Sequence, residues 1–91
     1  MNVFYVDVLI KMGEYEKNVT SFREAETSED ACYAALCGET HNKALTRAEF
    51  DAGNEWWDDY MVYSVRSVYQ VPEQLAIELV KANKWPMTLI H

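Results

Sequence analysis

Residues 2–12 read NVFYVDVLIKM and predict a long β-strand, because apolar side chains occupy every second position. The even positions from Phe4 to Met12 are all apolar, whereas the odd positions include Asp7 and Lys11. Side chains in a strand alternate between the two faces of a sheet. One face of this strand should therefore lie in the core, and the other should be half covered.

A second strand is predicted at about residues 18–26, after a polar connection that begins at Gly13. Its alternation of apolar and polar residues is imperfect, which favours a β-bulge or an edge position. Because the two strands follow one another closely in the chain, we expect them to pair as an antiparallel hairpin.

A helix is predicted to follow this hairpin directly. Thr27 supplies a hydroxyl group for the cap, and Glu29 and Asp30 fall in the first turn, where the helix dipole favours acidic side chains. The helix should run to about Cys37 and end at Gly38. Small and apolar residues four positions apart should form its inward face, namely Ala31, Cys32, Ala35 and Leu36.

A second, shorter helix is predicted where Thr46 and Glu49 have the spacing of a capping box. It should end near Gly53. The longest strand should then run over about residues 59–71, with one face formed by Met61, Tyr63, Val65, Tyr69 and Val71.

The last helix should begin at Pro72, which suits the first position of a helix. Residues 87–90 could then add a short edge strand. The predicted order is β-β-α-α-β-α, and 91 residues with 49% hydrophobic content suit one domain with one core. We therefore predict that residues 1–91 form a single acidic α+β domain. It should have a three- or four-stranded antiparallel sheet with helices packed on one face.

The net charge is −7, and the acidic surplus lies in the middle of the chain. Residues 24–59 hold ten acidic and two basic side chains, whereas the rest of the chain holds five acidic and six basic ones. Binding to nucleic acid or to anionic lipid requires clustered Lys and Arg, so we expect neither as a direct partner. No apolar run is long enough to span a membrane and no signal peptide opens the chain, which predicts a cytoplasmic protein.

The segment 49–60, EFDAGNEWWDDY, combines five carboxylates with four aromatic rings and contains no basic residue. Trp and Tyr are enriched at the hot spots of protein interfaces, and such an acidic surface suits a positively charged partner. If a strand covers Trp56 and Trp57, alternation places one of them in the core and the other outward. The alternative is that both tryptophans pack beneath the neighbouring helix.

Motifs for catalysis or metal binding are weak in this sequence. Cys37 and His41 are four residues apart, and Cys32 or Glu39 could add a ligand, but a helix that ends at Gly38 would separate the first two. The chain has no phosphate-binding glycine loop, no nucleophile elbow and no dinucleotide fingerprint. We therefore predict a protein that is not an enzyme, with no catalytic residue, no metal site and no cofactor. A small Cys/His enzyme or metal protein is the least favoured alternative.

Residues 22–36, FREAETSEDACYAAL, lead from the predicted hairpin into a capped, alanine-rich helix. In this segment, and in its size, acidity and α+β composition, the chain resembles small phage-encoded inhibitors of bacterial defence, the anti-CRISPR proteins among them. The resemblance implies a stoichiometric inhibitor that acts in the cytoplasm of the host bacterium. Its partner would be the basic nucleic-acid-binding surface of a host defence complex, and its carboxylates could imitate the phosphates of a nucleic acid.

We expect two groups of residues to contact such a partner. The first comes from the acidic-aromatic segment, and the second from the junction between the second strand and the first helix. The first group is Asp51, Glu55, Trp56, Trp57, Asp58, Asp59 and Tyr60, and the second is Glu26, Glu29 and Asp30. The main alternative function is a homodimeric adaptor, in which the tryptophan pair and a sheet edge bury against a second copy of the chain.

Overall fold

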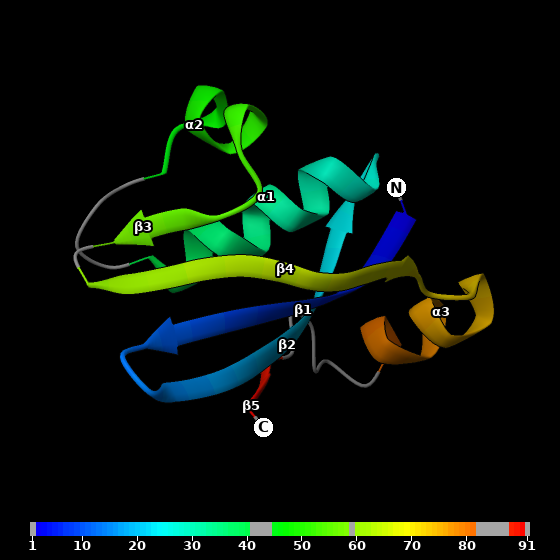
Figure 1. Ribbon diagram of the computed structural model, residues 1–91. Coiled ribbons are helices and arrows are strands. Elements are labelled where there is room, and N and C mark those ends of the chain that lie inside the picture. The colour runs from blue at the N-terminus through cyan, green and yellow to red at the C-terminus, as the bar shows by residue number, and fades with distance from the viewer. Residues whose placement is uncertain (1, 41–44, 59, 82–87, 91) are drawn as a thin grey trace.

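The computed structural model describes residues 2–40, 45–58, 60–81 and 88–90. Within these residues the chain has the predicted α+β fold, with three helices and a five-stranded antiparallel sheet (Figure 1). The elements are β1 (Asn2–Met12), β2 (Tyr15–Ala25), α1 (Ser28–Glu39), α2 (Arg47–Ala52), β3 (Trp56–Asp58), β4 (Met61–Gln70), α3 (Glu73–Lys81) and β5 (Thr88–Ile90).

The first two strands pair along their whole length and form the predicted hairpin. Met12 lies opposite Tyr15, so the connection is only Gly13 and Glu14. Gly13 has a φ of 62°, which glycine adopts without strain in a two-residue turn. This tight turn starts β2 three residues before the predicted position. A bulge or an edge position was expected for the second strand. The pairing of β1 with β2 has no shift in register, and β2 lies between β1 and β5, so neither expectation holds for this strand.

The order of strands across the sheet is β3-β4-β1-β2-β5. The strand predicted at 59–71 is in fact β4 alone, which begins at Met61, and β3 is a separate strand that ends at Asp58. β3 is therefore the strand that the sequence pattern missed. β5, at Thr88–Ile90, is the short edge strand expected near the end of the chain, and it pairs with residues 19–21 of β2.

A β-bulge lies between β1 and β4, where the register shifts between Asp7 and Val8 and leaves Arg66 as the extra residue of β4. The bulge exchanges the two faces of β4 along its length. Tyr63 faces the core before the bulge, whereas Tyr69 lies beyond it on the opposite face and is 57% exposed. The prediction that these two tyrosines share a face is therefore wrong.

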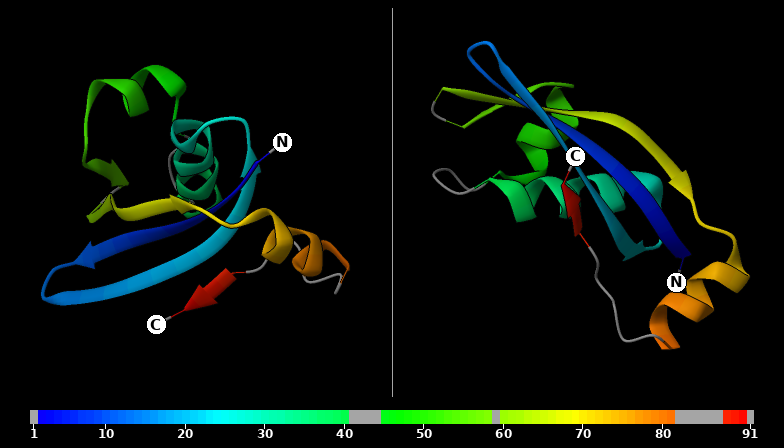
Figure 2. Two further views of the ribbon diagram at one scale, coloured as in Figure 1. Left: turned by 90° about the vertical axis from the view of Figure 1, so that its right-hand side faces the viewer. Right: turned by 90° about the horizontal axis from the view of Figure 1, so that it is seen from below.

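α1 and α2 lie on one face of the sheet, and α3 lies at the end of the sheet where β4 finishes (Figure 2). α1 packs against β1, β2 and β4. Its predicted cap is present, because the backbone N–H of Asp30 donates to Oγ1 of Thr27 over 3.2 Å. The predicted inward face is also confirmed, with Ala31, Cys32, Ala35 and Leu36 all buried.

α1 continues past Gly38, where it was expected to end, and finishes at Glu39 with Thr40 as its C-cap. Gly38 lies against the side chain of Arg23 on β2. A Cβ atom at this position would come within 2.9 Å of a guanidinium nitrogen of Arg23. The glycine therefore makes room for a neighbouring side chain and does not end the helix.

α2 begins at the predicted capping box. The backbone N–H of Glu49 donates to Oγ1 of Thr46, and the backbone N–H of Thr46 donates to Oε1 of Glu49, each over 3.2 Å. The helix ends with Gly53 as its C-cap, as expected. Phe50 is the buried residue of this short helix. The position of α2 therefore depends on the packing of Phe50 against the rest of the core as well as on the capping box.

Tyr63 connects the sheet to the end of α1. Its side chain is among the largest fully buried ones, with 1% exposed, and its hydroxyl group donates to the backbone oxygen of Glu39 over 3.2 Å. Burial raises the pKa of Tyr63, and the negative charges of Asp58 and Glu39 add to the shift. The tyrosine therefore stays protonated and keeps its role as a donor.

Replacing Tyr63 with Phe should lower the free energy of unfolding by about 1 kcal/mol, because the substitution removes one buried hydrogen bond and keeps the ring. Urea denaturation followed by circular dichroism would measure the change. Tyr69→Phe is the matched control, since Tyr69 is exposed, and it should leave stability within about 0.5 kcal/mol of the natural protein. Equal effects of the two substitutions would contradict this role for Tyr63.

Candidate functional site

The β3–β4 hairpin, meaning β3, β4 and the turn between them, contains the tryptophan pair. β3 is an edge strand that pairs only with β4. Trp56 lies opposite Tyr63, and Trp57 lies opposite Val62. Because side chains alternate along β3, the two tryptophans point to opposite faces, as the sequence predicted.

Trp56 is the tryptophan that belongs to the core, with 9% of its surface exposed. Its indole Nε1–H donates to the backbone oxygen of Glu49 over 3.1 Å. Its ring stacks on Phe50, with centroids 5.2 Å apart and an interplanar angle of 15°. Trp56, which was predicted to contact a partner, is therefore mostly buried, and it holds β3 against α2.

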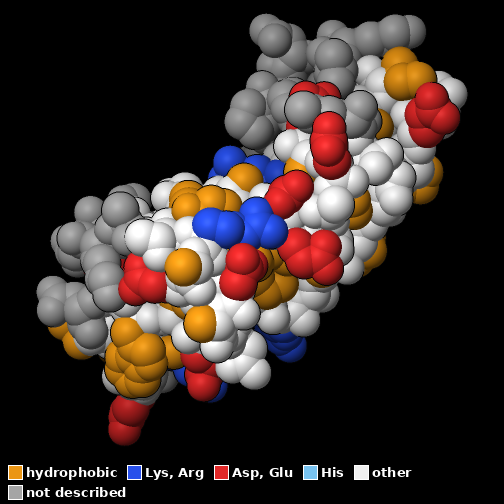
Figure 3. Space-filling model, turned by 90° about the horizontal axis from the view of Figure 1, so that it is seen from above, with side chains coloured by type: hydrophobic (Ala, Val, Ile, Leu, Met, Phe, Trp, Pro, Cys, Tyr) orange, Lys and Arg blue, Asp and Glu red, His pale blue; other side chains and the backbone are white. Residues whose placement is uncertain are grey.

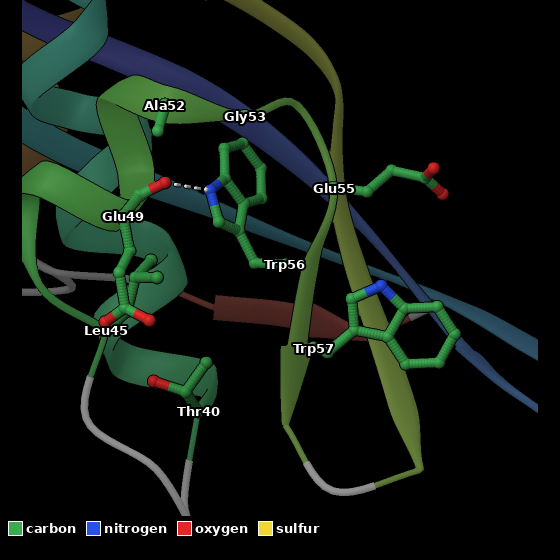
Figure 4. A pocket seen from close by; sticks show the side chains of 8 residues that line it. All are labelled: Thr40, Leu45, Glu49, Ala52, Gly53, Glu55, Trp56 and Trp57. Atoms are coloured by element: carbon green, nitrogen blue, oxygen red, sulfur yellow. Dashed lines mark hydrogen bonds between the residues drawn. The ribbon is translucent and has the colours of Figure 1, made fainter.

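Trp57 is 66% exposed, and Tyr60 in the turn is 67% exposed. Glu55 is also exposed and, in Figure 4, points to the same side of β3 as Trp57, away from Trp56. Residues two apart on an extended strand share a face, which explains this arrangement. Three of the predicted contact residues are therefore exposed on or beside this short hairpin. They are Trp57 and Tyr60, which present rings, and Glu55, which presents a carboxylate.

Asp58 does not belong to this exposed group. It lies on the same side of β3 as Trp56, and it is only 1% exposed, so the prediction that it contacts a partner is wrong. Its charge acts inside the protein, where it contributes to the raised pKa of Tyr63. Asp59, the neighbouring predicted contact, lies outside the described residues.

Arg47, at the start of α2, brings together two acidic residues that are far apart in sequence. Its guanidinium donates to Asp30 of α1 over 2.7 Å and to Asp51 of α2 over 3.1 Å. The same guanidinium lies 5.5 Å from the ring centroids of Tyr33 and Phe50. One acidic residue of the first helix and one of segment 49–60 therefore converge, and they do so around a basic side chain.

The pKa values of this group follow from its geometry. Hydrogen bonds from Arg47 and Thr27 lower the pKa of Asp30, and hydrogen bonds to Asp30 and Asp51 raise the pKa of Arg47. The two aspartates are thus partly neutralised, whereas Glu26 and Glu29 are exposed and carry their charge toward solvent. Figure 3 shows Asp and Glu side chains surrounding basic side chains on the α2 side of the molecule.

A pocket of about 360 Å³ lies between the end of α1, α2 and β3 (Figure 4). The hydrogen bond from Trp56 to the backbone oxygen of Glu49 joins α2 and β3, the two elements that form much of its wall. Its lining residues are Thr40, Leu45, Glu49, Ala52, Gly53, Glu55, Trp56 and Trp57. The sequence did not predict this pocket. The capping box indicates the helix that forms one wall and the tryptophan pair indicates the strand that forms another, but neither pattern gives the distance between the two elements.

The cysteines have different environments. Cys32 is buried, and burial raises the pKa of its thiol. Cys37 is exposed, and its Sγ lies 3.8 Å from the backbone oxygen of Leu45. His41, its suggested partner, lies outside the described residues. In the part of the chain that the structure describes, no group of three or more His, Cys, Asp or Glu side chains could hold a metal ion.

The two tryptophans should differ sharply when each is replaced by Phe. Trp56→Phe removes a buried hydrogen bond and part of a stacked ring, so it should lower the free energy of unfolding by about 1–2 kcal/mol. Trp57→Phe is the matched control on the adjacent residue and should change stability by less than about 0.5 kcal/mol. Urea denaturation of both variants gives the comparison, and a larger loss for Trp57→Phe would contradict the assignment of the two rings.

The lowered pKa of Asp30 predicts a specific dependence of stability on pH. A carboxyl group with a lower pKa in the folded protein stabilises the fold above its unfolded pKa, here about 3.8, and this contribution is lost as the pH falls through the folded pKa. The difference in stability between the natural protein and Asp30→Asn should therefore be present near neutral pH and vanish on acidification.

The control for this measurement is Glu29→Gln, which removes an acidic side chain from the same helical turn without removing the hydrogen bond to Arg47. Urea denaturation at neutral and at acidic pH would separate the two effects. A stability difference for Asp30→Asn that is independent of pH, or that equals the one for Glu29→Gln, would show that the contact with Arg47 does not stabilise the fold.

Among the described residues, no helix has the length and apolar character needed to cross a membrane. No protein-family model, no curated protein and no solved structure matches the chain.

Proposed function

We propose that this protein is a small stoichiometric inhibitor, and not an enzyme, which binds a basic surface of another protein through the β3–β4 hairpin. The observation that carries the proposal is the exposure of Trp57 and Tyr60, at 66% and 67%, beside the exposed carboxylate of Glu55. Large exposed rings are costly in water and are the side chains that most often anchor protein interfaces. Alternation along β3 presents Trp57 outward on a strand that Trp56 fixes to the core.

The partner that suits this surface is the nucleic-acid-binding region of a host protein complex, which must be rich in Lys and Arg. A net charge of −7 would speed association with such a region, and desolvated rings would slow dissociation. An inhibitor of a bacterial defence complex, encoded by a phage and acting in the host cytoplasm, is the specific form of this function that we propose.

The positions of the acidic residues favour recognition through exposed rings with carboxylates around them. They favour less a regular row of carboxylates that imitates the phosphates of a nucleic acid. Arg47 lies between Asp30 and Asp51, so these three side chains together carry a net charge of only −1. Glu26, Glu29 and Glu55 are exposed and are therefore better placed to meet basic residues of the partner. The charge of Asp58 lies inside the fold and should contribute little to an interface.

A second candidate function, a homodimeric module, is favoured by a different surface. On the face of the sheet opposite α1, the ring of Tyr69 stacks on Tyr5 with centroids 4.9 Å apart, and Phe22 packs edge-on against Tyr5 at 5.5 Å. Size-exclusion chromatography with light scattering separates the two functions. A dimer that persists on dilution and is broken by Tyr69→Ala would favour the homodimer.

The proposed function is tested by capture of the partner on the immobilised protein from a bacterial lysate, followed by binding measurements with the purified partner. Trp57→Ala should weaken that binding by at least about tenfold, since interface hot spots are worth about 2 kcal/mol or more. Glu55→Lys should reduce the association rate and its dependence on salt. Tyr69→Ala is the matched control, because it removes another exposed ring, 57% exposed against 66% for Trp57, on a different part of the sheet.

The inhibitory part of the proposal requires competition. Nucleic acid that the partner normally binds should displace the protein from it, and the displacement should fail for a nucleic acid that the partner does not bind. Unchanged binding of the purified partner to Trp57→Ala would contradict the proposed surface. Simultaneous binding of the protein and the nucleic acid would contradict inhibition by occupation of the same site.

A further inference from the structure

The pocket between α1, α2 and β3 combines apolar walls with a negative electrostatic environment. Leu45, Ala52 and the Trp56 ring supply apolar surface. Glu49 places its carboxylate on the pocket side of α2 (Figure 4), where the capping bonds with Thr46 hold it. A volume of about 360 Å³ falls in the range of about 300–1,000 Å³ that is typical of ligand sites.

The end of α1 adds to the negative potential. Thr40, the C-cap of α1, lines the pocket, and the last turn of this helix contains no basic side chain. The C-terminal end of a helix carries a partial negative charge, which a nearby cation stabilises. Among the described residues that line the pocket there is no Lys, Arg or His. Glu49 is acidic, whereas the side chain of Glu55 points to the other side of β3 (Figure 4).

The Trp56 ring is held in place for contact with a ligand. Its Nε1–H is engaged by the backbone oxygen of Glu49, and the ring stacks on Phe50. A fixed indole ring is the best aromatic partner for a cation, and a planar guanidinium stacks on it more readily than an ammonium group does. The guanidinium of Arg47 is engaged by Asp30 and Asp51 and is not among the groups that line the pocket.

We propose that this pocket binds an arginine side chain of a partner protein. The guanidinium would lie against the Trp56 ring, with the carboxylate of Glu49 and the C-terminal end of α1 supplying the complementary charge. This proposal rests on the proposed function, because the arginine would belong to the partner protein proposed there. The ring that the arginine would contact, Trp56, points to the opposite face of β3 from Trp57, although Trp57 is also among the residues that line the pocket. The arginine would therefore add a second contact to the one proposed for Trp57.

The pocket can be tested with the protein alone, by nuclear magnetic resonance titration with N-acetyl-arginine amide. The Nε1–H resonance of Trp56, assigned with the Trp56→Phe variant, and the N–H resonance of Gly53 should shift and saturate. N-acetyl-citrulline amide, which has nearly the same shape without the charge, should produce no saturable shift. N-acetyl-lysine amide should bind more weakly than the arginine probe.

Glu49→Gln should weaken binding of the arginine probe by about threefold to tenfold, because it removes one charge at a partly open site. Glutamine can still close the capping box with Thr46, so α2 should remain folded. Glu78→Gln is the matched control, since it removes the same charge from an exposed position on α3, an element that contributes no residue to the pocket, and it should leave binding unchanged.

Equal shifts with the arginine and citrulline probes would overturn the proposal, as would binding that Glu49→Gln does not change or a lysine probe that binds more tightly than arginine. The proposed function can fail separately. The Trp57→Ala measurement uses the purified partner, whereas the arginine titration uses the protein alone, so binding of the arginine probe can be present even where partner binding through Trp57 is not.

Discussion

The hydrogen bond from the indole of Trp56 to the backbone oxygen of Glu49 is the contact on which the candidate site depends. It fixes α2 against β3, and the capping box at Thr46 and Glu49 fixes where α2 begins. With Trp56 held inward, the alternation of a β-strand leaves Trp57 and Glu55 to point outward. One buried ring therefore determines both the exposed surface of the hairpin and the pocket behind it.

The composition shows that the protein is acidic, but it does not show how the charged side chains are arranged in the fold. Arg47 brings Asp30 of α1 and Asp51 of α2 together, and so neutralises part of the acidic surplus of residues 24–59. Side chains alternate along β3, so Asp58 lies in the interior whereas the neighbouring Trp57 is exposed. The carboxylates best placed for recognition are then those of Glu26, Glu29 and Glu55, and recognition would combine them with aromatic anchors.

Local sequence signals predicted most of the fold correctly because they act over a few residues. The alternation of β1, the Thr27 cap and the Thr46–Glu49 box all appear as expected. The errors arose where a distant contact decided the outcome. Gly38 lies within α1, where the absence of a Cβ atom leaves room for the side chain of Arg23 on β2. Tyr69 changes face because β4 bulges at Arg66 against β1. For the site, alternation predicted that the tryptophans separate, but not which one faces outward or that a pocket forms.

The central claim is that Trp56 and Trp57, adjacent in sequence, occupy opposite environments. Hydrogen–deuterium exchange of the indole Nε1–H groups, followed by nuclear magnetic resonance, tests it most directly, with each resonance assigned from the single Trp→Phe variants. The account predicts slow exchange for Trp56, whose N–H is bonded to Glu49, and fast exchange for Trp57. Equal exchange rates, or slower exchange at Trp57, would contradict it.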